Sequence, residues 1–282
     1  MLLAIDAGNT ETVVGLFDLD ASSEVSGGSG DGGRNENVPA NLVEHFRIAT
    51  VAERTADEHA LLLSELLALQ GFEAASAVSG IAVTSSVPRV TSQLREMAQR
   101  YFPTPLVVIE PGVRTGMAIL YDNPKEVGAD RIANAVGAYD LYGGPTIVVD
   151  LGTATTFDAV SSDGGYLGGA IAPGIEVSMD ALFAQAAALR RVELVEPRHV
   201  IGKSTVESIQ SGAFYGFVAQ VDGLCRRFEQ ELGPSTVVAT GGLAGLMAGQ
   251  SEMVQHIDPW LTLHGLRIIY ERNVDRERSS DE

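Results

Sequence analysis

Two short acidic segments carry the residue types that could do chemistry in this sequence. They are IDAGNT at residues 5–10 and VDLGTA at residues 149–154, and their aspartates lie 144 positions apart in a chain of 282 residues. Each aspartate follows an apolar run and is followed two positions later by a glycine. A carboxylate can hold a cation, and the N–H groups of a glycine turn can approach phosphate oxygens. The pattern predicts a site for a nucleotide polyphosphate and its metal ion, which is what phosphoryl transfer requires.

A purely local explanation for each segment stays open, because Asp-x-Gly commonly forms a tight hairpin turn. The recurrence of the segment at half the chain length favours two related domains instead. A Walker-type phosphate loop would need a lysine after a glycine-rich turn, and no lysine precedes Lys125. The sequence therefore excludes a P-loop enzyme.

The composition limits the partners of the protein. The chain has 19 basic and 37 acidic residues and a formal charge of −18, so we expect no nucleic-acid partner and no membrane partner. Its single cysteine, Cys225, excludes an intramolecular disulfide framework and a cysteine-built zinc site. The N-terminus has no basic region and reaches Asp6 after a short apolar run, unlike a signal peptide. These features predict a cytoplasmic protein.

Hydrophobic periodicity predicts alternating strands and helices, which is typical of an α/β architecture. Strands are expected at residues 2–5, 12–17, 42–48, 81–85, 106–109, 146–149, 156–160 and 236–239, and helices at 55–69, 90–101, 126–142, 206–217 and 243–247. Residues 21–38 contain almost no large apolar side chain. We expect them to form a mobile loop, because they cannot offset the entropy of ordering.

A third segment, TGG at residues 240–242, follows an expected strand and could let the flat ring of an adenosine approach the backbone. A simple turn at the start of a helix is the alternative. Together with the two acidic turns, this segment resembles the superfamily of acetate and sugar kinases, heat-shock chaperones and actin. That resemblance implies an α/β fold of two duplicated ribonuclease H-like (actin-like) domains facing an ATP cleft.

More narrowly, the chain resembles the type III pantothenate kinases almost from end to end. The matching motifs are DAGNT at 6–10, YDNP at 121–124, GADR at 128–131, DLGT at 150–153, GAIAPG at 169–174, GKST at 202–205 and TGG at 240–242. The GADR motif followed by DLGT is the most specific part. The resemblance implies a first domain at residues 1–117, including the mobile loop 21–38, and a second at 118–282 whose last helix packs back on the first.

The activity that the resemblance implies is ATP-dependent phosphorylation of pantothenate to 4'-phosphopantothenate, the first step of coenzyme A biosynthesis. Asp130 is the expected general base. A carboxylate at a helix N-terminus is stabilised as the anion, so we expect Asp130 to accept a proton late and mainly to orient the attacking hydroxyl. A helix cap is the alternative role for Asp130, with Arg131 as its salt-bridge partner.

The resemblance also implies the binding residues. ATP, accompanied by Mg²⁺, is expected at Asp6, Ala7, Gly8, Asn9, Thr10, Glu11, Thr12, Val13 and Thr153. Pantothenate is expected at Tyr121, Gly128, Ala129, Asp130, Arg131 and Thr205. Asp150 is the expected ligand of a monovalent cation, K⁺ or NH₄⁺. The planar fork of Arg131 suits a substrate carboxylate, whereas Thr205 could instead be the N-cap of the helix that begins at residue 206.

Three further expectations follow. The family implies a homodimer in which the partner closes part of the substrate pocket. Apolar residues such as Ile175, Met179, Leu182 and Phe183 could form that interface or a domain core. Glu11 departs from the family pattern by adding negative charge near the phosphates, so we expect it to weaken ATP binding. The alternative functions are another superfamily kinase or a phosphatase of polyphosphate type, and a non-catalytic ATP-binding regulatory protein of the same fold.

Overall fold

The computed structural model describes residues 1–21, 25–26, 38–186 and 189–280. These residues form two compact units, unit 1 with residues up to 141 together with 260–280, and unit 2 with residues 142–259. Most of the mobile loop expected at 21–38 lies outside the described residues. The domain boundary expected between residues 117 and 118 stays a prediction. The compact units group residues that contact one another, whereas the expected boundary separates the two repeats of the sequence.

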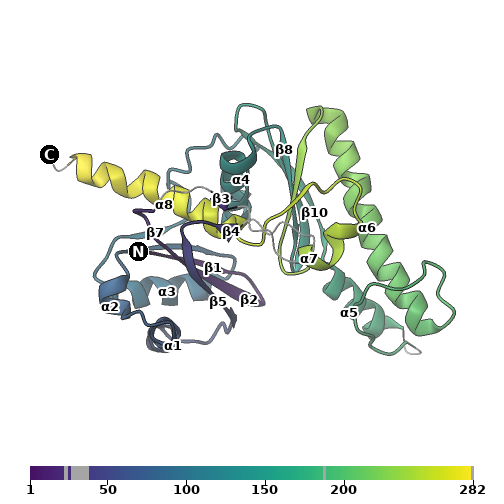
Figure 1. Ribbon diagram of the computed structural model, residues 1–282, viewed down its shortest axis with the longest axis horizontal. Coiled ribbons are helices and arrows are strands. Elements are labelled where there is room, and N and C mark those ends of the chain that lie inside the picture. The colour runs from purple at the N-terminus through teal and green to yellow at the C-terminus, as the bar shows by residue number, and fades with distance from the viewer. Residues whose placement is uncertain (22–24, 27–37, 187–188, 281–282) are drawn as a thin grey trace. The chain divides into compact units, whose positions relative to one another are not determined.

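Unit 1 is built on a five-stranded sheet with the strand order β5-β2-β1-β6-β7 (Figure 1). Its strands are β1 (Leu2–Ala7), β2 (Glu11–Phe17), β5 (Leu42–Ala49), β6 (Gly80–Ser85) and β7 (Leu106–Val108). The central strand β1 pairs antiparallel with β2 and parallel with β6, so the chain makes one hairpin and then crosses over. A separate two-stranded ribbon consists of β3 (Val25–Ser26) and β4 (Val38–Pro39).

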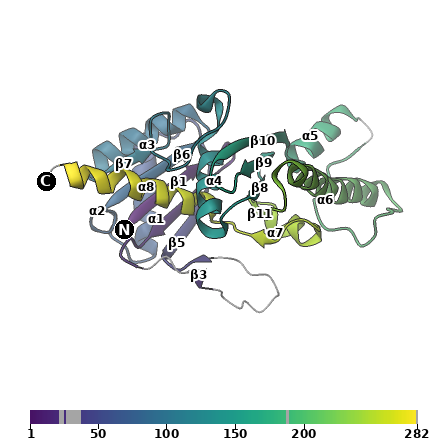
Figure 2. The same cartoon turned by 90° about the horizontal axis from the view of Figure 1, so that it is seen from above.

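Helices pack on both faces of this sheet because successive side chains of a strand point to opposite sides. Leu3, Ile5 and Ala7 of β1 pack with α1 (Ala56–Leu69) and α3 (Pro88–Tyr101). Leu2 and Ala4 pack with α4 (Ala129–Tyr142) and α8 (Leu261–Ser280). Two short elements, α2 (Ala74–Ala77) and η1 (Pro124–Glu126), complete unit 1. Figure 2 shows α8 running across this sheet in a view from above.

Unit 2 repeats the same topology. Its sheet has the order β10-β9-β8-β11-β12, in which β8 pairs antiparallel with β9 and parallel with β11. The strands are β8 (Thr146–Leu151), β9 (Ala154–Val160), β10 (Tyr166–Pro173), β11 (Thr236–Thr240) and β12 (His256–Ile257). The helices are α5 (Ile175–Gln185), α6 (Thr205–Leu232), α7 (Ala244–Met247) and η2 (Ala248–Gln250). The expected α/β fold of two duplicated ribonuclease H-like domains is confirmed.

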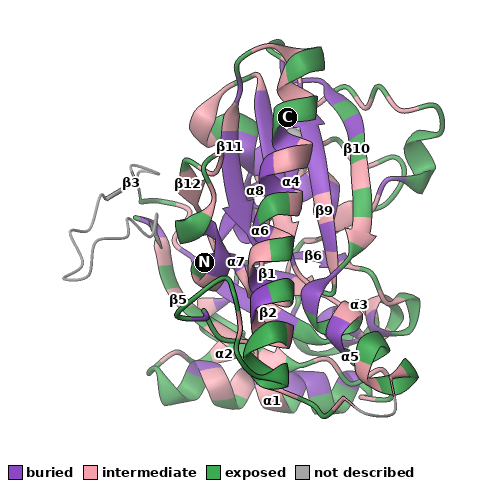
Figure 3. Ribbon diagram, turned by 90° about the vertical axis from the view of Figure 1, so that its right-hand side faces the viewer, coloured by how far each residue is buried: buried purple, intermediate pink, exposed green. Residues whose placement is uncertain are grey.

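Several elements of unit 2 differ from the sequence expectation, which contained neither helix α5 nor the short strand β12. The edge strand β10 was not expected, because glycines 168 and 169 and the final proline lower its strand propensity. Its residues alternate between buried and more exposed, as Figure 3 shows. Helix α6 begins at Thr205 and continues to Leu232, well beyond the expected end at residue 217.

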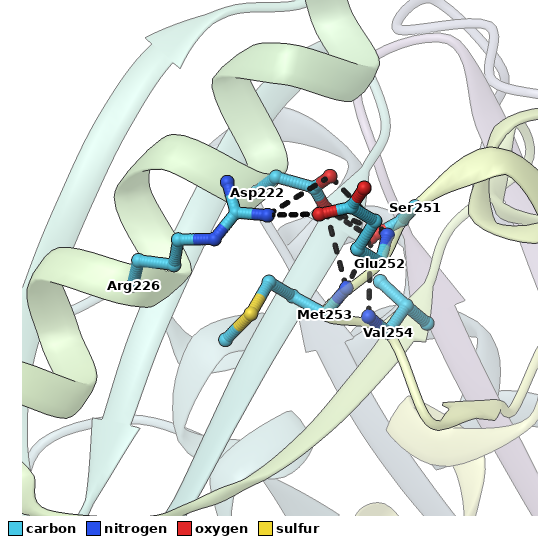
Figure 4. Close-up of polar contacts among 6 residues, drawn as sticks. All are labelled: Asp222, Arg226, Ser251, Glu252, Met253 and Val254. Atoms are coloured by element: carbon cyan, nitrogen blue, oxygen red, sulfur yellow. Dashed lines mark hydrogen bonds and ion pairs between the residues drawn. The ribbon is translucent and has the colours of Figure 1, made fainter.

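The middle of α6 is anchored to the segment that leads into β12. The buried carboxylate of Asp222 accepts hydrogen bonds from the Ser251 hydroxyl and from the N–H groups of Glu252 and Met253, at 3.1 Å and 3.3 Å for the two amides (Figure 4). Arg226, one turn along the helix, pairs with Glu252 and lies 3.9 Å from Asp222. These contacts bind α6 to the chain that follows α7.

Among the described residues, every helix is too short or too polar to cross a membrane.

Candidate active site

The first acidic turn lies at the end of β1 in unit 1. Asp6 is the penultimate residue of β1 and is partly buried, and the turn closes through a hydrogen bond from Gly8 N–H to the Glu11 carbonyl oxygen at 3.0 Å. Asn9 and Thr10 at its tip are exposed. By strand alternation, Asp6 belongs to the face of Leu2 and Ala4, on which α4 and α8 pack. The turn therefore offers exposed polar groups beside a carboxylate on the α4 face.

The neighbouring strand β5 modifies the charge of this turn. Glu11 forms an ion pair with Arg47 of β5 at 2.5 Å, and both side chains are partly exposed. The hydroxyl groups of Thr12 and Thr50 are hydrogen-bonded at 2.8 Å. The arginine offsets part of the negative charge that Glu11 adds, and the expected weakening of ATP binding by Glu11 stays a prediction.

The second acidic turn lies at the end of β8 in unit 2. Asp150 is the penultimate residue of β8, and Gly152 N–H donates to the Ala154 carbonyl oxygen at 3.1 Å. This turn is one residue shorter than the first, in which Gly8 N–H reaches the carbonyl oxygen of Glu11. Thr153 is exposed, and its carbonyl oxygen accepts a hydrogen bond from Gly174 at 3.1 Å. A Cβ on Gly174 would lie 2.4 Å from that oxygen. The glycine of the GAIAPG motif thus lets the following helix start directly against the turn.

Gly241 of the TGG segment lies beside the Asp150 carboxylate. Strand β11 is paired so that Thr240 is opposite Asp150, and Gly241 comes next with φ +90°. A Cβ at Gly241 would lie 2.5 Å from Asp150 Oδ1 and 2.8 Å from the Leu151 backbone. Only glycine suits this position, because it tolerates the left-handed region and adds no atoms. The absence of a side chain at Gly241 lets β11 approach the Asp150 carboxylate and the Leu151 backbone closely.

The GADR motif forms the start of α4 in unit 1. Asp130 lies in the first turn of the helix, and its carboxylate accepts a hydrogen bond from the N–H of Arg131 at 2.8 Å. A Cβ on Gly128 would lie 2.5 Å from Asp130 Oδ1, so glycine is needed for this carboxylate position. Arg131 is only 8 % exposed. A carboxylate held at a helix N-terminus can orient a hydroxyl, and the guanidinium of the next residue, Arg131, can bind an anionic group.

Thr205 lines a cavity of about 860 Å³ in unit 2, together with Lys203, Met179, Leu182 and Phe217. The hydroxyl of Ser204, the N-cap of α6, accepts the Glu207 N–H at 3.2 Å. The alternative role of Thr205 as N-cap is therefore wrong, because the helix begins one residue earlier than expected. The spacing of Ser204 and Glu207 is the sequence signal of a helix start that could have located Ser204.

The expected residues are divided between the two units. Unit 1 contains residues 6–13, Tyr121 and residues 128–131, and unit 2 contains Asp150, Thr153 and Thr205. Within unit 1, the first turn and the start of α4 are associated with the same face of one sheet. The sequence alone did not indicate that Arg47 pairs with Glu11 or that Gly174 packs against the Thr153 backbone. Pairing between strands and close backbone contact leave no local signature in the sequence.

Comparison with known proteins assigns the chain. Residues 2–227 match the family model of the type III pantothenate kinases. A type III pantothenate kinase of Streptomyces griseus is 53% identical over 98% of this chain and all of that protein. The chain belongs to the type III pantothenate kinase family. A family member from Myxococcus xanthus is 51% identical, with 97% of this chain and 99% of that protein covered.

Solved structures agree with the fold of this type III pantothenate kinase family member. A protein of the Baf family of transcriptional activators from Campylobacter jejuni has a TM-score of 0.57 at 18% identity, with 97% of this chain and 99% of that one covered. A Sinorhizobium meliloti protein named for 2-dehydro-3-deoxygalactonokinase has a TM-score of 0.55 at 14% identity, with 97% of both chains covered. At these identities the likeness shows the fold alone.

Proposed function

We propose that the protein transfers the γ-phosphoryl group of ATP to pantothenate and so forms 4'-phosphopantothenate, the first step of coenzyme A biosynthesis. The observation that carries this proposal is the start of α4, where Asp130 and the nearly buried Arg131 stand together in the motif most specific to the family. A cytoplasmic location is part of the proposal, because ATP is the phosphoryl donor and Cys225 is the single cysteine.

In this proposal Asp130 is the general base. Its carboxylate already accepts the N–H of Arg131, so one oxygen is fixed in position while the other can face a hydroxyl. Phosphoryl transfer has a loose transition state and depends mainly on positioning and charge neutralisation. Asp130 therefore orients the terminal hydroxyl of pantothenate and takes its proton late in the reaction.

Pantothenate carries a carboxylate at the end opposite its reacting hydroxyl, and Arg131 is the proposed partner of that group. A guanidinium binds both oxygens of a carboxylate through parallel hydrogen bonds. Tyr121, Gly128 and Ala129 complete the proposed contacts in unit 1. Thr205 supplies a further contact from unit 2, where its hydroxyl lines the cavity at the start of α6.

ATP is proposed to bind through residues 6–13 and Thr153. The exposed tip of the first turn offers N–H groups and the side chains of Asn9 and Thr10, which donate hydrogen bonds without adding positive charge. No cluster of three or more metal-binding side chains occurs among the described residues. This fits Mg²⁺, which is commonly held by one or two carboxylates together with the substrate phosphates.

The proposed ligand of a monovalent cation, K⁺ or NH₄⁺, is Asp150. Its carboxylate lies at a strand end next to the backbone of Gly241, where a side chain would overlap it. A carboxylate oxygen is a ligand that suits a hard cation. When bound, such an ion would offset the negative charge of the phosphates, and the role of Asp150 is to hold it there.

A homodimer is the proposed assembly. Unit 2 exposes a group of apolar side chains around the cavity that Thr205 lines, with Ile201 82% and Val200 64% exposed. A second copy that covers this surface would also close the substrate pocket. We expect Ile201→Glu to give a monomer with little activity in light-scattering and kinase measurements. Leu69→Glu, at an exposed apolar position of α1 in unit 1, is the matched control and should remain dimeric.

The decisive experiment measures ADP release by the purified protein with ATP and Mg²⁺, with and without pantothenate and K⁺. We expect turnover that requires pantothenate, with a phosphorylated product of the expected mass. Turnover with other small alcohols would indicate another kinase of the superfamily, and ATP hydrolysis without an acceptor would indicate a phosphatase. ATP binding without any turnover would support the alternative of a non-catalytic regulatory protein.

A further inference from the structure

The last helix, α8, joins two parts of unit 1 that the proposed reaction must hold at a defined separation. One part is β1, which leads into the turn at residues 6–13. The other is α4, whose first turn carries Asp130. The chain reaches α8 only after it has completed unit 2.

The backbones of α4 and α8 meet at two glycines. A Cβ on Gly265 of α8 would lie 1.9 Å from the carbonyl oxygen of Ala133 in α4. A Cβ on Gly137 of α4 would lie 2.7 Å from the carbonyl oxygen of Leu261 in α8. Any side chain at either position would force the helices apart, because the overlap is with backbone atoms. The crossing distance is therefore fixed by the absence of two side chains.

Two side-chain contacts set the register of this crossing. The Thr262 hydroxyl donates to Oδ1 of Asn134 at 2.6 Å, and Asn134 is completely buried. His264 Nε2 lies 2.9 Å from Oδ2 of Asp140, and His264 is 1% exposed. Asn134 and His264 are the buried members of these pairs, whereas Thr262 is half-buried and Asp140 is exposed. A buried polar group that loses its partner is left unsatisfied, so both pairs resist sliding of α4 along α8.

The opposite side of α8 packs tightly on the sheet. Leu263, Leu266 and Tyr270 share one buried cluster with Leu2 and Ala4 of β1. The fit again depends on glycines, because a Cβ at position 15 in β2 would lie 2.8 Å from Leu263 and one at position 80 in β6 would lie 1.9 Å from the Tyr270 hydroxyl. Helix α8 thus packs on β1, the strand that carries Asp6, and on α4, the helix that carries Asp130 in its first turn.

We propose that α8 is a positioning element for phosphoryl transfer, in which Gly265 and the Thr262–Asn134 pair set the place of Asp130 relative to the turn at residues 6–13. This inference rests on the proposed function, because it assigns that turn to ATP and Asp130 to the attacking hydroxyl. A displacement of about 1 Å between reacting groups can cost about 10²-fold in rate. Small changes at the crossing should therefore lower kcat while each substrate still binds its own residues.

The test compares Gly265→Ala and Thr262→Val with Thr262→Ser, which keeps the hydroxyl. The control is Leu67→Val, in the cluster on the opposite face of the same sheet. We expect Gly265→Ala and Thr262→Val to lower kcat roughly 10- to 100-fold. KM for pantothenate and affinity for a non-hydrolysable ATP analogue should change less than threefold. Thr262→Ser and Leu67→Val should keep kcat within about twofold.

A second measurement does not depend on activity. Spin labels at Val43→Cys in β5 and Tyr139→Cys in α4, both exposed positions, report the distance from the sheet to α4 in a Cys225→Ala background. We expect this distance to shift or broaden in Gly265→Ala and Thr262→Val, and to be unchanged in Thr262→Ser and Leu67→Val. If Gly265→Ala does not fold, the milder Thr262→Val decides both measurements.

The outcomes separate this inference from the proposed function. An unchanged distance in Gly265→Ala and Thr262→Val would overturn the inference, and so would a changed distance with normal kcat. In both cases pantothenate turnover by the wild-type protein would leave the proposed function standing. A wild-type protein without turnover would overturn the proposed function and the catalytic role of α8, while the spin-label distances would still decide whether α8 holds α4 in place.

Discussion

The turns after β1 and β8 occupy the same place in two sheets of the same topology, but their surroundings differ. Asp6 is paired with Thr84 of β6, and Asp150 is paired with Thr240 of β11. The next residue is Ser85 in unit 1 and Gly241 in unit 2. The topology places a carboxylate at the strand end in both units, whereas the residue after the threonine decides what can come close to it.

The two units also differ in what packs on the sheet face that carries the strand-end aspartate. In unit 1, α4 brings Asp130 to the face of the sheet on which Asp6 lies. In unit 2, the described hydrophobic cluster includes Ile147 and Val149 and so belongs to the face opposite Asp150. In the proposed function these roles are divided, so that unit 1 supplies the base and unit 2 holds the cation.

The largest expected effect tests that division at Asp130. Replacing Asp130 by Asn should lower kcat roughly 10²- to 10⁴-fold, the range that general acid–base groups contribute, with little change in ATP affinity. Steady-state kinetics and calorimetry measure the two quantities. Glu65→Gln, at an exposed position of α1, is the control and should behave as the wild type. Full activity of Asp130→Asn would remove this residue from the role of base.

Asp150→Asn should act differently, because its proposed role is to hold a cation. We expect the stimulation of turnover by K⁺ to disappear, while the activity without K⁺ remains close to that of the wild type. Initial rates measured over a series of KCl concentrations, with ionic strength kept constant by a large organic cation salt, give the result. Stimulation at the wild-type level would place the cation site elsewhere.

The matched positions Ser85 and Gly241 test how much room each unit leaves beside its strand-end aspartate. Gly241→Ala places a Cβ within 2.5 Å of Asp150 Oδ1 and forces alanine to a φ of +90°. We expect a loss of about 2 to 4 kcal/mol in the free energy of unfolding, together with loss of the K⁺ effect. Ser85→Ala removes only hydrogen bonds to Val87 and should cost about 1 kcal/mol. Equal effects in thermal unfolding would contradict the contrast.

We expect the stability of unit 1 to depend on pH, because His59 of α1 is buried there. Burial, helped by the charge of Arg54 and opposed by that of Glu58, lowers the pKa of His59 from 6.5 to about 4. Since the unfolded chain binds the proton first, stability is unaffected above pH 6.5 and falls as the pH decreases towards 4, by about 3 kcal/mol in all. Denaturant titrations between pH 4 and 7 measure this loss.

His59→Gln should flatten that pH dependence, and the same change at the exposed His199 of unit 2 is the control. A pH dependence that is unchanged in His59→Gln would show that other groups account for acid sensitivity.

The smallest expected effect concerns the core of unit 2. Burial raises the pKa of the Cys225 thiol to about 12, with Asp222 and Glu229 contributing in the same direction. The thiol should therefore remain protonated and unreactive at neutral pH in the folded protein. Alkylation followed by mass spectrometry should show modification only after denaturation. Rapid labelling of the native protein would mean that α6 opens readily.

Much of the fold follows from local patterns. The apolar runs before Asp6 and Asp150 predict strands that end at a carboxylate, and their recurrence predicts two related sheets. The helix signals around α1 are equally local, since Thr55 and Glu58 form a capping box. Edge strand β10 escaped prediction because its stability comes from pairing with β9, which compensates for its poor strand propensity.

The sequence by itself determined the chemistry that is available, namely two acidic turns, the GADR segment and the family to which they belong. Only the tertiary structure decided that Gly241 lies against Asp150, that Arg47 pairs with Glu11, and that α8 locks α4 to the first sheet. The physical reason is that local signals such as caps, turns and periodicity act over a few residues. Contacts between backbones and across strands join residues that are tens of positions apart, and in the case of α4 and α8 more than a hundred. These contacts exist only once the chain has folded.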